Sequence, residues 1–135
     1  MCAAAEAFFR GDVCALECYQ KLSGELERRY PDMETKVQKS QISFYDSGFF
    51  CCVSLPRTKK GGQAMIVTFG LDAPVPDARI AQAVEPYPNR WMHHVPVHQP
   101  SEIDGQLLAW IDWSHAFAQN RRTAGRKRHE SNGSD

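Results

Sequence analysis

The residues with the richest chemistry lie together in the segment 85–94, which reads EPYPNRWMHH. Arg90 offers a planar fork of five donors, which suits a carboxylate or a phosphate. Trp91 offers a ring for stacking, and His93 and His94 could ligate a metal or transfer a proton near neutral pH. Because adjacent residues of a strand point to opposite faces, the two histidines are not expected to ligate one ion together. The segment indicates a recognition site, or else a core tryptophan with both histidines bonded to backbone groups at a sheet edge.

A second polar cluster lies in the segment 36–45, which reads KVQKSQISFY. In one continuous strand, Lys39, Gln41 and Tyr45 would share a face. Such a face is often merely solvated, but lysine and glutamine beside an aromatic ring could also line a pocket with Arg90. We therefore predict a ligand-binding set that consists of Lys36, Lys39, Gln41, Tyr45, Arg90, Trp91, His93 and His94.

An enzyme is the alternative reading of the same histidines. A metal-assisted hydrolase or a nuclease-associated enzyme would use His93, His94 or His98 as a ligand or general base. A metal site would need His93 or His94 together with His98, or with a carboxylate such as Glu85 or Asp112. The sequence has no HExxH or CxxC motif, no glycine-rich phosphate loop and no glycine elbow around a serine. We therefore predict neither a metal nor a cofactor, and we assign no catalytic residue.

The composition indicates one globular domain with a basic end. Of the 135 residues, 42% are hydrophobic and 24% are charged, and 16 basic residues balance 16 acidic ones. The balance is uneven along the chain, because residues 121–135 hold five basic and two acidic residues. That end has a net charge of +3, which leaves −3 for the other residues. No apolar run is long enough to cross a bilayer, so no membrane partner is expected.

The cysteines favour a reducing compartment. There are five of them, an odd number that suits free thiols better than a disulfide framework. Cys14 and Cys18 are spaced to meet on one helical face, where small apolar packing is the simplest role. Because the N-terminus lacks the pattern of a secretory signal, we expect a cytoplasmic protein.

Hydrophobic periodicity predicts an α+β fold. Apolar residues recur at helical spacing between Asp12, a candidate N-cap, and Pro31. An antiparallel meander of four to five strands is expected to follow, and Pro96 indicates that its last strand lies at an edge. The strand segments are 35–44 (one strand or two), 49–55, 64–69 and 93–98. The stretch between 71 and 87 is expected to be irregular, with a short helical turn or strand at Ile80, Ala83 and Val84 as its one regular part.

The C-terminal part of the sequence predicts a helix that packs on the sheet. Ser101 and Asp104 resemble a capping box, and a broad apolar face follows as far as Phe117. After Asn120 the apolar residues stop. We therefore predict a single domain over residues 1–120 and a disordered basic tail over residues 121–135.

Three segments carry a resemblance to a known family: KVQKSQISF (36–44), AVEPYPNRWMHHV (83–95) and EIDGQLLAWI (102–111). They resemble a widespread bacterial family of small cytoplasmic proteins that is known as a domain of unknown function. Similar domains are fused to endonuclease-like modules or carry the label "predicted transport protein". The resemblance implies a compact α+β domain and supplies no reaction, substrate or catalytic residue.

The sequence favours a non-catalytic binding module over an enzyme. The ligand could be a protein, a small anion or a nucleic acid, and the basic tail could itself contact nucleic acid. A structural homodimer, in which an edge strand pairs with its own copy, is a further alternative to a monomer.

Overall fold

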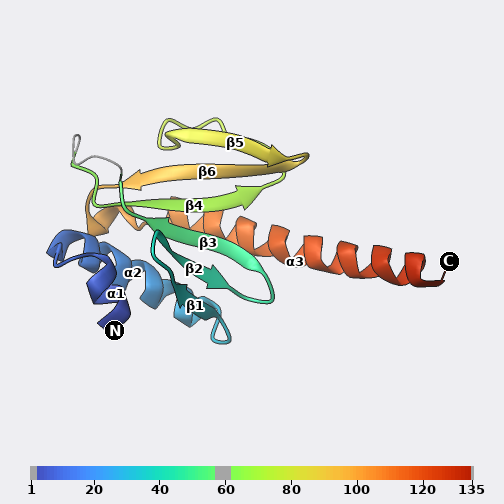
Figure 1. Ribbon diagram of the computed structural model, residues 1–135. Coiled ribbons are helices and arrows are strands. Elements are labelled where there is room, and N and C mark those ends of the chain that lie inside the picture. The colour runs from blue at the N-terminus through green and yellow to red at the C-terminus, as the bar shows by residue number, and fades with distance from the viewer. Residues whose placement is uncertain (1–2, 57–61, 135) are drawn as a thin grey trace.

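Two helices precede a six-stranded antiparallel sheet and a third helix follows it, as Figure 1 shows. This computed structural model describes residues 3–56 and 62–134, without the side chains of 121–134. The α+β class is confirmed, with six strands in place of four to five. The helices are α1 (Ala3–Phe8), α2 (Val13–Arg29) and α3 (Gly105–Ser134), with a 3-10 turn at Pro100–Glu102. The strands are β1 (Glu34–Val37), β2 (Gln41–Tyr45), β3 (Phe49–Ser54), β4 (Met65–Leu71), β5 (Gln82–Tyr87) and β6 (Arg90–Val97).

Helix α2 begins and ends where the sequence indicates. The Asp12 carboxylate accepts a hydrogen bond of 3.0 Å from the backbone N–H of Ala15, which confirms the N-cap. The helix ends at Arg29, two residues before Pro31. Its buried face consists of Ala15, Cys18, Tyr19, Leu22 and Leu26, at the three- and four-residue spacing expected of an amphipathic helix.

The strand order β1-β2-β3-β4-β6-β5 corrects two expectations about the last strands. Strand β6 is not at an edge, because β5 pairs with its outer side. Strand β5 is hard to recognise in the sequence, because almost all of its residues are exposed and show no apolar alternation. Pro96 is tolerated in β6 because the pairing between β5 and β6 begins at Gln82 and His94. The part of β6 after His94 therefore has no strand partner on that side. The missing N–H therefore faces a stretch with no strand partner.

A β-bulge in β3 creates a link between the sheet and α3. Phe44 pairs with Cys51, but Tyr45 pairs with Phe49, so Phe50 is an extra residue. The hydroxyl of Ser114 on α3 donates to the carbonyl of Phe50 at 2.6 Å and accepts from the N–H of Gly70 at 3.0 Å. One buried side chain therefore satisfies a backbone group on each of two strands.

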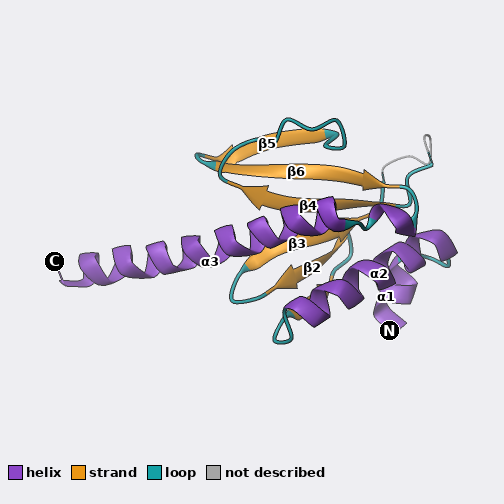
Figure 2. Ribbon diagram, turned by 180° about the vertical axis from the view of Figure 1, so that it is seen from behind, coloured by secondary structure: helices purple, strands orange, loops and turns teal. Residues whose placement is uncertain are grey.

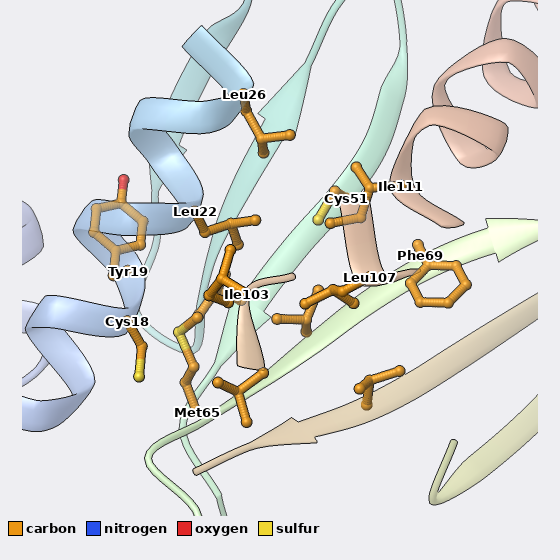
Figure 3. Close-up of a cluster of buried hydrophobic side chains, with 14 of the residues drawn as sticks. Cys18, Tyr19, Leu22, Leu26, Cys51, Met65, Phe69, Ile103, Leu107 and Ile111 are labelled. Atoms are coloured by element: carbon orange, nitrogen blue, oxygen red, sulfur yellow. The ribbon is translucent and has the colours of Figure 1, made fainter. Parts of the chain in front are cut away.

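All of the helical packing lies on one face of the sheet. Figure 2 shows α2 and α3 side by side in front of that face. Figure 3 shows their buried side chains meeting those of the strands, with Leu22 and Leu26 from α2, Leu107 and Ile111 from α3, and Cys51, Met65 and Phe69 from the sheet. No described helix covers the opposite face (Figures 1 and 2), which we call the uncovered face.

Helix α3 starts later than expected and continues further. Asp104, not Ser101, is the capping residue, since its carboxylate accepts a hydrogen bond of 3.1 Å from the N–H of Leu107. Ser101 lies in the preceding 3-10 turn. The helical backbone runs past Asn120 to Ser134, so the segment predicted as a tail continues α3, and the domain boundary at residue 120 stays a prediction. No helix in the described part of the chain is both long and apolar enough to span a bilayer.

Candidate functional site

A row of polar side chains crosses the uncovered face, with one residue from each strand. The pairing register aligns Lys36 with Ser43, Ser43 with Cys52, Cys52 with Thr68, Thr68 with His94, and His94 with Gln82. Strand spacing gives this row a length of about 24 Å. Its centre is buried by neighbouring side chains, because Ser43, Cys52 and Thr68 are each 6% exposed or less. Its two ends, Lys36 and Gln82, are exposed. We call these six residues the polar row.

Thr68 lies between Cys52 and His94 in the polar row. Its Oγ1 lies 2.9 Å from Nδ1 of His94. Burial lowers the pKa of His94, so its ring is neutral at neutral pH. Burial also raises the pKa of Cys52 to about 11, against an opposing effect of the Thr68 hydroxyl, so Cys52 is a thiol at neutral pH. The direction of the Thr68 bond sets the tautomer of His94: Nε2 carries the ring hydrogen when the hydroxyl donates to Nδ1, and Nε2 is an acceptor when Nδ1 donates to the hydroxyl.

His94 borders a depression of about 610 Å³ on the uncovered face. Within residues 3–56 and 62–134, Nε2 of His94 makes no hydrogen bond. A ligand group that donates or accepts a hydrogen bond could therefore bind there, beside the side-chain amides of Gln63 and Gln82. The depression is lined by Ser54, Leu55, Pro56, Gln63, Ile66, Ala81, Gln82 and His94.

The other end of the polar row carries a cation and two aromatic rings. Nζ of Lys36 lies 4.8 Å from the centre of the Tyr45 ring, and the Tyr45 and Phe49 rings pack edge to face at 5.9 Å. Gln41 donates to the Ser43 hydroxyl at 2.7 Å, and that hydroxyl donates to the side chain of Gln38 at 3.2 Å. This end offers positive charge, amide groups and a surface for stacking.

The structure separates the predicted ligand-binding set between the two faces. Lys36, Gln41, Tyr45, Arg90 and His94 lie on the uncovered face, as their register and the contact of Arg90 with Gly70 indicate. Trp91 and His93 are paired with Leu71 and Phe69 on the helix-covered face. Lys39 lies in the turn between β1 and β2, because the two strands are separate elements and not one continuous strand.

His93 is a core residue. Its side chain is fully buried, and its ring stacks on Phe69 with centres 5.1 Å apart. Nε2 accepts a hydrogen bond of 3.1 Å from the N–H of Val75, whereas Nδ1 has no hydrogen-bond partner among the described residues. Burial lowers the pKa of His93, although the carbonyls of Trp91 and Phe69 act in the opposite direction. The expectation that adjacent histidines point to opposite faces is therefore confirmed.

Another group of polar side chains lies on the helix-covered side and makes its contacts within the group. Nε2 of His115 lies 2.7 Å from the Asp46 carboxylate, and the ring of His115 stacks on Tyr30 at 3.9 Å. The Tyr30 hydroxyl donates to Asp112, and burial raises the pKa of Tyr30. Because each described polar group has a partner within the cluster, we assign it to holding α2, α3 and the β2–β3 turn together.

The sequence did not point to Thr68, Cys52 and Gln82 as members of the site. Thr68 stands within an apolar strand and Cys52 within another, so their residue types suggested packing. Gln82 belongs to β5, a segment that the sequence leaves open between a helical turn and a strand. The signal that could have found the first two is alternation, since each would face away from the apolar side of its strand.

A family model described as a domain of unknown function, DUF5655, matches residues 5–120. The chain belongs to the DUF5655 family. The resemblance to a domain of unknown function is thereby confirmed, and the labels of similar domains stay expectations. No curated protein and no solved structure matches the chain.

The matched part of the DUF5655 chain holds the whole sheet and every member of the polar row. It also holds the three histidines of the enzyme alternative, which lie in three environments. His93 is in the core, His94 is on the uncovered face, and His98 follows β6, where its Nδ1 is 3.2 Å from Glu102. Among the described residues of this DUF5655 domain, no three His, Cys, Asp or Glu side chains are placed to hold a metal ion.

Proposed function

We propose that this protein is a non-catalytic binding module that takes an extended ligand across the uncovered face of its sheet. One observation carries the proposal: the polar row crosses all six strands on a face that no described helix covers. Its members near the two ends, Lys36, His94 and Gln82, are exposed or half-buried and can bond to a ligand. The buried Ser43 and Thr68 between them bond to side chains beside them. A cytoplasmic location is part of the proposal, and the free thiols of the four described cysteines support it.

Among the possible ligands, the spacing of the cations favours a polymer over a small anion. Lys36 lies on β1 and Arg90 on β6, four strand spacings apart in the sheet. That separation is about 19 Å across the sheet, and Arg90 also lies four residues along β6 from His94, the residue in line with Lys36. One small anion therefore cannot contact both side chains. A chain of linked anionic groups could reach both.

Single-stranded nucleic acid is the polymer whose chemistry fits best. Proteins bind single strands with aromatic rings that stack on bases, amide groups that read base edges, and cations that contact phosphates. Here Tyr45 and Phe49 supply the rings and Lys36 the cation, and Nε2 of His94 can hydrogen-bond to a base edge. Because the body of the chain has a net charge of −3, we expect weak, salt-sensitive binding.

The other two hypotheses receive less support. In its metal-site form, the enzyme alternative needs several ligands together, and no group of three His, Cys, Asp or Glu side chains among the described residues is placed to hold a metal ion. A homodimer formed by edge strands would use β1 or β5, and these are poor edges for pairing. Strand β1 has four residues, and β5 carries Pro86 near its end.

The test is fluorescence anisotropy with a labelled 12-nucleotide uridine RNA in 50 mM and 200 mM NaCl. We expect binding that weakens with salt, and about a tenfold loss of affinity in both His94→Ala and Lys36→Gln. His98→Ala and Lys21→Gln are matched controls, because both residues are exposed and lie away from the uncovered face. Thr68→Val should weaken binding as His94→Ala does, and adding it to His94→Ala should have little further effect.

Two results would count against the proposal. One is binding that survives His94→Ala and Lys36→Gln but is lost when Arg126, Lys127 and Arg128 are changed to glutamine, since the C-terminal segment would then be the binding element. The other is the absence of binding to the RNA together with saturable binding to a protein or peptide, which would replace nucleic acid as the ligand class.

A further inference from the structure

An apolar groove lies on the helix side of the molecule, away from the polar row. It runs between α3 and the connection that follows β4, and its volume is about 550 Å³. Trp113 lies on its wall with 57% of its surface exposed. The groove is lined by Leu71, Asp72, Ala73, Pro74, Val75, Pro76, Trp113, Ala116, Phe117 and Asn120.

The helical wall of this groove forms one continuous stripe. Trp113, Ala116, Phe117 and Asn120 follow each other at three- and four-residue spacing, so they share one side of α3. The inward side of the helix is a different one, because Leu107, Ile111 and Ser114 are the residues buried against the sheet. An exposed tryptophan beside a row of apolar side chains is typical of a protein interface.

Helix α3 continues from this stripe beyond the sheet. Figures 1 and 2 both show its C-terminal part projecting past the strands without another element beside it. The fourteen residues from Arg121 to Ser134 would extend about 21 Å as a helix. Most helical stability in proteins comes from tertiary packing, so a partner along this part of α3 would stabilise it.

The charges of the chain point to a second copy as that partner. Residues 121–135 have a net charge of +3, and the rest of the chain has −3. If two chains pack antiparallel along α3, each basic end lies against the acidic body of the other copy. Asp72, which lines the groove, is an acidic residue beside the stripe on α3. In a two-fold dimer both basic ends meet an acidic body in the same way, because the two copies contribute the same surface to the interface.

We propose that the Trp113 groove and the stripe on α3 form an isologous interface between two copies of this chain, packed antiparallel along α3. This interface lies on the helix side and leaves both uncovered faces accessible. The proposal does not depend on the nature of the ligand that binds there.

The test is sedimentation equilibrium of the full chain between 5 and 200 μM. We expect a dimer whose dissociation constant rises at least about 30-fold in Trp113→Glu, since a central tryptophan commonly dominates an interface. Tyr87→Glu is the matched control, because Tyr87 is 62% exposed but lies on β5, and it should dimerise like the unchanged chain. Circular dichroism establishes that each variant is folded.

Salt provides a second measurement on the same dimer. Raising NaCl from 50 to 500 mM should weaken association several-fold, because the basic ends and acidic bodies attract each other. A monomer over the whole concentration range, or dimerisation unaffected by Trp113→Glu, would overturn the proposal. Dimerisation that is lost in Trp113→Glu but indifferent to salt would overturn the antiparallel arrangement.

Discussion

Replacing Ser114 with alanine will lower the free energy of unfolding by about 2–4 kcal/mol, since each of two buried backbone groups would lose its partner. The bulge at Phe50 interrupts regular pairing between β3 and its neighbours, and the Ser114 hydroxyl bonds to Phe50 and Gly70 in its place. Alanine leaves a buried carbonyl and a buried N–H unpaired. Urea unfolding followed by circular dichroism measures the loss.

The matched control for this substitution is Ser23→Ala on α2. Ser23 also lies in a helix and its hydroxyl makes one exposed hydrogen bond, to Glu27 at 3.4 Å. Its replacement should change the free energy of unfolding by less than about 0.5 kcal/mol. Equal effects of the two substitutions would show that Ser114 does not link α3 to the bulge.

Acidification from pH 7.5 to 5.5 will reduce the stability of the fold, and His93 will account for about 1.4 kcal/mol of the loss if it stays neutral when folded. Burial holds the pKa of His93 below its ordinary value of 6.5. Between the lowered pKa and 6.5, the unfolded chain binds a proton that the folded chain does not. Stability is therefore complete above pH 6.5 and falls as the pH decreases towards the folded pKa. His94 acts in the same direction.

The variant that tests this assignment is His93→Leu. It will be less stable at every pH, because the N–H of Val75 loses its acceptor. However, its loss between pH 7.5 and 5.5 should be about 1.4 kcal/mol smaller than that of the unchanged chain. His98→Asn, a change at an exposed histidine, is the control. A His93→Leu chain with an undiminished loss would contradict the burial of a neutral His93.

The sequence predicts the parts of this fold whose apolar residues are periodic. Helix α2, its cap at Asp12 and the central strands β3 and β4 follow from spacing and hydrophobicity alone. For β5 the sequence leaves a short strand or a helical turn open, because an exposed edge strand that contains a proline has neither alternation nor an apolar run. Because β5 is not recognised with certainty in the sequence, β6 seems to be the edge strand. Pro96 supports that conclusion, but β6 lacks an outer strand partner only beyond His94, near its C-terminal end.

The candidate site could be predicted only in part, because it depends on strand order. Alternation correctly separates His93 from His94, and the same rule places Gln41 and Tyr45 on one face. It fails at Lys39, since a turn interrupts the assumed strand. The alignment of Thr68 with His94 is a matter of register between strands far apart in sequence, which a single sequence does not specify.

The most direct test of ligand binding on the uncovered face is a titration of ¹⁵N-labelled protein with the uridine RNA, followed by amide chemical shifts. Binding across the polar row predicts saturable shifts that gather around Lys36, Ser43, Cys52, Thr68, His94 and Gln82, and leave residues 105–115 of α3 nearly unchanged. Shifts that saturate instead along α2 and α3, with the polar row unaffected, would contradict the proposed binding face.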